Sequence, residues 1–102
     1  MELLNEELRA QLPPLYDQEK TPDPIVHAKF FTPWTGWTWF VTEGSNQEDD
    51  FIFFGYIIGQ ESEWGYFSLA ELESVCGPCG LRIERDLYFN PKRTSQIPGI
   101  KK

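Results

Sequence analysis

Two cysteines stand three positions apart, at Cys76 and Cys79, with Gly and Pro between them. This spacing can form a redox-active dithiol when one thiolate is stabilised at the N-terminus of a helix. Here the pair follows a predicted short helix and precedes a glycine and a strand-like segment, and the C-terminus of a helix does not favour a thiolate. The sequence therefore favours a turn with two incidental thiols and keeps a dithiol redox protein using Cys76 and Cys79 as an alternative.

Other signs of catalysis or metal binding are weak. His27 is the one histidine of the chain, and it lies inside a predicted strand, where it is interpreted as an ordinary strand residue. No nucleophile elbow and no glycine-rich phosphate loop occurs in the sequence. Two cysteines and one histidine are fewer than the four ligands of a structural zinc site. The sequence favours a protein without catalysis, cofactor or metal ion over a small hydrolase-like or metal-dependent enzyme.

Carboxylates dominate the middle of the chain. The 52 residues between Lys29 and Arg82 contain no Lys or Arg but eight acidic side chains. Their order does not match the alternating pattern of a calcium loop, which leaves either solvated turns or a negative surface that binds a basic protein. The candidates for that surface, all in or near predicted turns, are Glu43, Glu48, Asp49, Asp50, Glu61 and Glu63.

The chain contains four tryptophans, a residue type that can stack on sugars or single-stranded bases. Base stacking normally comes with a basic groove, and the tryptophan-rich segment has no basic residue. Most of these rings are therefore assigned to the core. Trp34 is the one expected to be exposed, because it lies in a Pro-Trp-Thr-Gly turn.

Length and charge limit the remaining function classes. With 102 residues the chain has the size of one domain. Its net charge of -7 argues against direct nucleic-acid binding by the folded body. Residues 1–90 carry -11 and residues 91–102 carry +4. We expect residues 1–90 to form the domain and residues 91–102 a disordered basic tail, which leaves a tail-driven nucleic-acid binder as a further alternative.

The sequence also predicts a cytoplasmic protein that does not bind membranes. No apolar run approaches the roughly 18 residues that a membrane-spanning helix needs. The N-terminal segment is acidic and does not resemble a signal peptide. Two cysteines are too few for a secreted disulfide scaffold and fit a reducing compartment.

Periodicity predicts the elements that carry these residues. A first helix is expected after an Asn5 cap and before Pro13, and a second over residues 69–75 after a Ser68 cap. Strands are expected over residues 25–31, 37–42, 51–58 and 63–67, with an edge strand at 83–89. Gly55 inside the third strand indicates a bulge or a close neighbour. The predicted fold class is α+β: an antiparallel meander of four or five strands with two short helices.

Several segments carry a resemblance to a known family. They are LPPLY at 12–16, DPIVHAKFFTP at 23–33, WTWFVTEGS at 37–45, FFGY at 53–56, EWGYFSL at 63–69 and ERDLYF at 84–89. The chain resembles a small family of domains of unknown function from plasmids, integrative conjugative elements and phages of bacteria. Members of that family also occur fused within polyvalent proteins that travel with antirestriction modules. The resemblance implies an accessory role in a mobile genetic element and brings no established active site.

These observations lead to one expectation of function. We expect a non-enzymatic, acidic protein-binding module of a mobile genetic element, whose partner has a basic surface. Its specific form would be a counter-defence inhibitor of a nucleic-acid-binding host protein.

Overall fold

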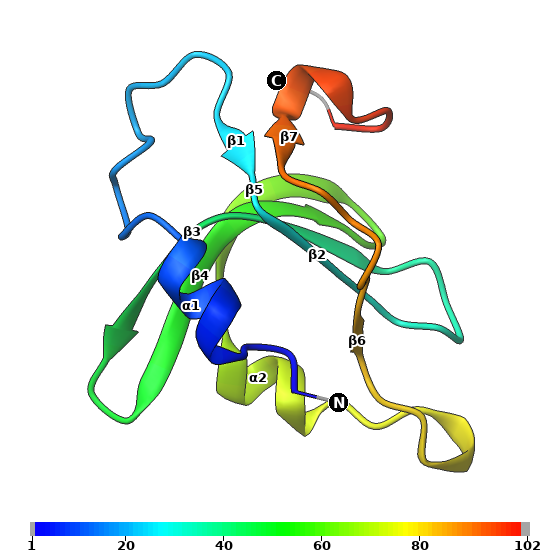
Figure 1. Cartoon of the computed structure of the whole chain (residues 1–102). Helices are drawn as coiled ribbons and strands as arrows, with labels where there is room; N and C mark the ends of the chain where they lie inside the picture. The colour runs from blue at the N-terminus through cyan, green and yellow to red at the C-terminus, as the bar shows by residue number, and fades with distance from the viewer. Residues whose placement is uncertain (1, 101–102) are drawn as a thin grey trace.

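A five-stranded antiparallel sheet forms the centre of the computed structural model, which describes residues 2–100 (Figure 1). The strand order is β5-β4-β3-β2-β6. The strands are β2 (Ala28–Phe31), β3 (Thr38–Gln47), β4 (Asp50–Ile58), β5 (Ser62–Ser68) and β6 (Glu84–Arg85). A second, two-stranded sheet pairs β1 (Ile25–Val26) with β7 (Lys92–Arg93). The predicted α+β class with an antiparallel meander is confirmed.

Both predicted helices are present and both begin at the predicted caps. In α1 (Glu6–Gln11) the Asn5 side chain accepts a hydrogen bond from the Leu8 N–H at 2.8 Å. In α2 (Leu69–Ser74) the Ser68 hydroxyl accepts one from the Glu71 N–H at 3.0 Å. These bonds satisfy backbone donors that the first helical turn leaves without partners. No described helix is long and apolar enough to cross a membrane.

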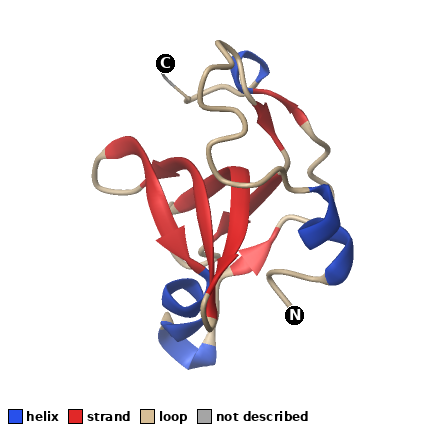
Figure 2. Ribbon diagram, turned by 90° about the vertical axis from the view of Figure 1, so that its left-hand side faces the viewer, coloured by secondary structure: helices blue, strands red, loops and turns tan. Residues whose placement is uncertain are grey.

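The two faces of the sheet bury different clusters. The helices cover one face, where Phe30 and Phe53 are fully buried and meet edge to face at 5.5 Å. The other face buries a smaller cluster around Phe40 and Tyr56, closed by Ile97 near the C-terminus. Figure 2 shows the sheet between α2 at one end of the molecule and the β1–β7 pair at the other. The central strands β3 and β4 are therefore covered on both sides.

A β-bulge at Thr42 interrupts the pairing of β3 with β4. Val41 pairs with Gly55, but the next pair joins Glu43 to Phe54. A Cβ atom at Gly55 would collide with the Phe40 carbonyl oxygen, which confirms the predicted close neighbour. Because side chains alternate along a strand, the extra residue moves Glu43 from the helix-covered face to the opposite face.

The C-terminal segment corrects two expectations. The edge strand predicted at 83–89 is reduced to β6, since the chain turns after Asp86.

Residues 91–100 do not form a disordered tail: β7 and the 3-10 turn Thr94–Gln96 pack against the domain. The buried Thr94 hydroxyl donates to the Pro24 carbonyl at 2.6 Å, and Ser95 bonds to Asp23. These partners, together with the buried Ile97, order a segment whose terminal position, with Pro98 and Gly99, indicated disorder. Lys101 and Lys102 lie outside the described residues.

Candidate protein-binding groove

The predicted acidic surface is divided by β4. Glu48 and Asp49 lie in the turn before this strand, whereas Glu61 lies in the turn after it and Glu63 in β5. A strand of nine residues spans about 30 Å. The two acidic groups therefore occupy opposite ends of the sheet and do not converge.

Glu43 does not lie on the surface at all. It is 4% exposed, and its two carboxylate oxygens accept hydrogen bonds from the Tyr16 N–H at 2.9 Å and the Gln18 N–H at 2.6 Å. The sequence placed Glu43 near a turn because β3 was expected to end at residue 42. The strand instead continues through the bulge to Gln47.

Asp50 has a structural contact that its place in an acidic run did not reveal. Its carboxylate accepts hydrogen bonds from the Phe51 N–H at 2.7 Å and from the Ala70 N–H at 3.1 Å. These bonds, led by the one from Phe51, lower the pKa of Asp50. Asp50 thus joins the start of β4 to the first turn of α2.

The exposed tryptophan is Trp37 and not Trp34. Trp34 is half-buried, with its ring packed against Gly77. Trp37 is 40% exposed, lies over Gly59 and meets the Trp39 ring at 5.9 Å. The prediction missed this because the turn residues around Trp34 do not reveal the glycine that covers its ring.

An open groove runs between Trp37, the turn from β4 to β5, and α2. Its volume is about 810 Å³. Trp39, Leu72 and Phe67 form its buried apolar part, while Trp37 remains accessible. Three exposed carboxylates line it, from Glu61, Glu63 and Glu71. None of the described residues that line it is Lys or Arg. Such a groove can bind a segment that combines apolar and cationic side chains.

The elements around the groove hold its charged groups in place. Glu63 pairs across the sheet with Ile57, so its position follows from the β4–β5 register. Glu71 lies in the first turn of α2, where its N–H is bonded to the Ser68 cap. Of the six predicted carboxylates, the structure places only Glu61 and Glu63 in this groove. Glu71 was missed because it lies in the predicted second helix, whereas the candidates were taken from predicted turns.

The two cysteines lie in the turn after α2, as the sequence predicted. Both are free thiols and both are exposed. Cys79 has a left-handed backbone, with φ of 58°. Within residues 2–100 no group of three or more His, Cys, Asp or Glu side chains is arranged to hold a metal ion.

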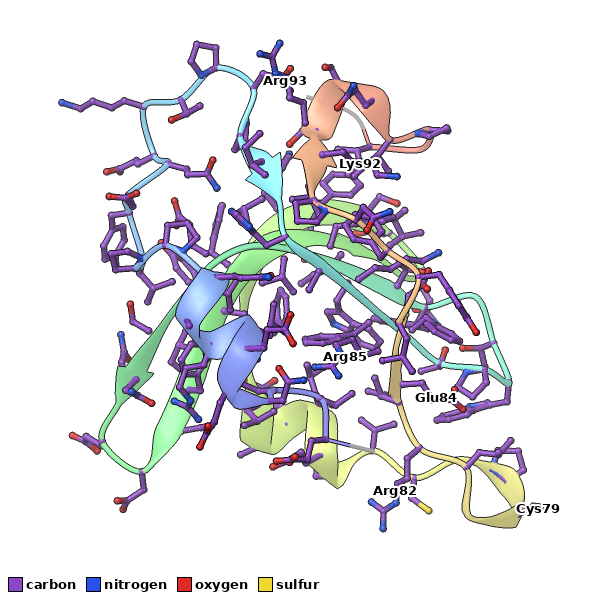
Figure 3. The ribbon with its side chains drawn as sticks, in the orientation of Figure 1. Cys79, Arg82, Glu84, Arg85, Lys92 and Arg93 are labelled. Carbon is purple, nitrogen blue, oxygen red and sulfur yellow. The ribbon has the colours of Figure 1, made fainter. Side chains whose placement is uncertain are left out.

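The basic residues near the C-terminus are spread along the molecule. Figure 3 places Arg82 beside Cys79 in the loop after α2, Lys92 and Arg93 at the other end, and Arg85 between them. The Lys92 ammonium lies 5.0 Å from the centre of the Phe89 ring. These side chains therefore do not gather into one basic groove.

Comparison with known proteins gives one match. No curated protein and no solved structure shows significant similarity to this chain. A family model matches residues 3–97, which is nearly the whole chain and includes β7 and the following turn. The chain thus belongs to the family described as protein of unknown function (DUF2958).

Proposed function

We propose that this protein is a non-enzymatic binding module whose acidic groove takes a basic segment of a partner protein. The observation that carries the proposal is the lining of the groove: an accessible Trp37 beside three carboxylates, with no Lys or Arg among the described lining residues. Tryptophan is enriched among the residues that contribute most to protein interfaces. Carboxylates at the edge of such a site speed association with a positively charged partner and disfavour acidic ones.

The biological setting is the second part of the proposal, and it is supported by the resemblance described above. The module would serve a mobile genetic element in the cytoplasm of a bacterial host. Its partner would be a nucleic-acid-binding defence protein, and the groove would engage basic side chains that otherwise contact DNA or RNA. Inhibition by competition for that basic surface requires no catalytic residue.

The alternatives have less support. The thiols of Cys76 and Cys79 follow a helix, whereas activation by a helix dipole requires a helix N-terminus. The hypothesis that a free basic tail binds nucleic acid also has less support, because residues 91–100 are folded against the domain.

Two double variants with equal charge test the proposal. Glu61→Lys with Glu63→Lys reverses two charges in the groove. Glu48→Lys with Asp49→Lys reverses two exposed charges at the other end of β4 and serves as the matched control. Each protein is immobilised and exposed to bacterial lysate, and the retained proteins are identified and quantified.

We expect one or more basic proteins to bind the wild type and the control but not the groove variant. Addition of DNA in excess should release such a protein from the wild type. Equal retention by both variants would contradict the groove as the binding site. Retention of nucleic acid by the wild type, unchanged in the groove variant, would favour the tail-driven alternative.

A further inference from the structure

A second hollow lies on the face of the sheet that the helices do not cover. Residues 13–24 lie beside β3, β4 and β5 there and border an open pocket of about 350 Å³. The connector is held by the Glu43 carboxylate, which binds the Tyr16 and Gln18 N–H groups. The Gln18 side chain adds a bond to the Thr42 carbonyl at 2.9 Å. The pocket therefore has a fixed wall, and its volume lies at the lower end of the range for small-ligand sites.

Aromatic rings form most of the remaining wall. The Tyr66 ring lies 4.9 Å from Phe54 and 6.4 Å from Tyr16, and it is tilted by 56° and 59° to them. The Trp64 ring lies 6.0 Å from Phe54. Trp64 stacks nearly parallel to Phe54, at 18°, whereas Tyr66 is tilted to both Phe54 and Tyr16. The π faces of the tilted tyrosine rings can attract a cation.

The charge in this pocket is negative and lacks a cationic partner. Glu43 is 4% exposed, and among the described residues no Lys or Arg forms an ion pair with it. A carboxylate has about four acceptor positions, and the two N–H groups of the connector use two of them. Glu19 adds a second carboxylate to the lining. The two N–H groups offset part of the cost of burying this charge, and a bound cation would offset more of it.

We propose that this pocket binds an alkylammonium cation, with the aromatic rings around its methyl or methylene groups and the Glu43 and Glu19 carboxylates supplying the opposite charge. Two sources share this chemistry: a free small amine, or the alkylated side chain of a lysine. The site is separate from the acidic groove, and Tyr66 is the residue that borders both.

The backbone at Tyr16 supports a role for its ring. Its φ is 75°, a left-handed conformation that is costly for a residue with a side chain. Tyr16 is 59% exposed, so burial of apolar surface does not account for a tyrosine at this position. Glycine would fit the backbone better but would remove one wall of the pocket.

Tyr66 provides a reporter for the same space. Desolvation, hydrogen bonding to Tyr16 and the negative charges of Glu43 and Glu19 raise the pKa of Tyr66. A cation bound between these groups would offset the carboxylate charges. Binding should therefore lower the pH at which this tyrosine ionises.

The first experiment uses choline and its neutral isostere 3,3-dimethylbutanol as probes. The indole N–H resonances of the four tryptophans are followed by NMR on the intact protein. We expect choline to shift the Trp64 resonance in a saturable manner and to leave Trp34 and Trp37 unchanged. The neutral isostere should have no saturable effect. Equal responses to both probes would mean an apolar pocket without cation selectivity and would overturn the proposal.

Variants then separate binding from folding. Tyr16→Gly should keep or raise the melting temperature while weakening choline binding by about tenfold, the size of one lost cation–π contact. Tyr66→Ala should weaken it similarly. The control is Tyr88→Ala, which removes a tyrosine that is 93% exposed and lies outside the pocket. If Tyr16→Gly bound choline as well as the wild type, the proposed aromatic wall would be wrong.

The last comparison identifies the source of the cation. A short peptide with one trimethyllysine is titrated beside choline and beside the same peptide with unmodified lysine. Tighter binding of the trimethyllysine peptide than of choline assigns the pocket to a modified protein side chain, and the reverse order assigns it to a free amine. No saturable binding of either would refute the site. Glu71→Lys reverses a groove carboxylate on α2, outside the pocket and the strands that line it, and should leave all these titrations unchanged. Loss of choline binding and loss of partner binding at the groove can therefore be distinguished.

Discussion

At the scale of single residues, Glu43 determines how the connector is attached. Glu43→Gln keeps one acceptor but turns an NH₂ group toward a backbone N–H, so one buried donor loses its partner. We expect a loss of about 2 kcal/mol in the free energy of unfolding, measured by urea denaturation. The control Glu48→Gln, in an exposed turn, should stay within about 0.5 kcal/mol of the wild type. Equal stability of the two variants would show that the connector is held by other contacts.

His27 gives the fold a dependence on pH. Desolvation lowers the pKa of His27 from its ordinary value of 6.5. The unfolded chain therefore binds more protons at this site as the pH falls below about 6.5. The contribution of the neutral His27 side chain to the free energy of unfolding is fully present above about pH 6.5. It is lost as the pH falls through the lowered pKa of the folded state. Between about pH 7.5 and 5.5, the wild type should lose more stability than His27→Gln does. Parallel pH profiles in denaturant melts would contradict this.

At the scale of elements, the N-terminus of α2 links the helix to the sheet and positions the groove. Ser68→Ala removes the oxygen that accepts the Glu71 N–H, at a cost of about 1 kcal/mol. Ser74→Ala, in the exposed last turn of the same helix, is the control and should cost less. Thermal melts of both variants provide the measurement. A larger loss at Ser74 than at Ser68 would mean that the cap does not limit the stability of α2.

The elements were largely predictable because local patterns determine them. The caps at Asn5 and Ser68, the apolar run of β4 and the glycine at Gly55 each act through neighbours close in sequence or across one strand pair. The bulge at Thr42 was not visible in this way, because it depends on how the register of β3 fits β4. The burial of Glu43 and the existence of its pocket follow from that register. The site was therefore less predictable than the fold.

At the scale of the whole molecule, the C-terminal segment is part of the domain. A chain that ends at residue 90 loses the buried Ile97 and the bond from Thr94 to Pro24, and it exposes the cluster around Phe40 and Tyr56. We expect the free energy of unfolding to fall by about 3 kcal/mol. The control chain ends at residue 100 and keeps these contacts. Coincident melting curves of the two truncated proteins would restore the view of residues 91–100 as a dispensable tail.

The distribution of charge over the whole molecule predicts how binding responds to salt. Glu61 and Glu63 lie at the opposite end of β4 from the Glu48–Asp49 turn, about 30 Å away. Electrostatic interactions decay over about 10 Å at 0.1 M salt but over about 30 Å at 0.01 M.

A basic partner that contacts Glu61 and Glu63 should therefore interact with the distant turn only at low salt. At about 0.1 M salt, Glu61→Lys with Glu63→Lys should slow association while Glu48→Lys with Asp49→Lys leaves it near the wild-type rate. At about 0.01 M, both pairs should slow it, because each changes the net charge equally. Association rates from stopped-flow fluorescence provide the measurement. The contrary result is that, at the higher salt, Glu48→Lys with Asp49→Lys slows association as much as the groove variant does. The partner would then also contact the Glu48–Asp49 turn, and the proposal that the groove is the binding site would be wrong.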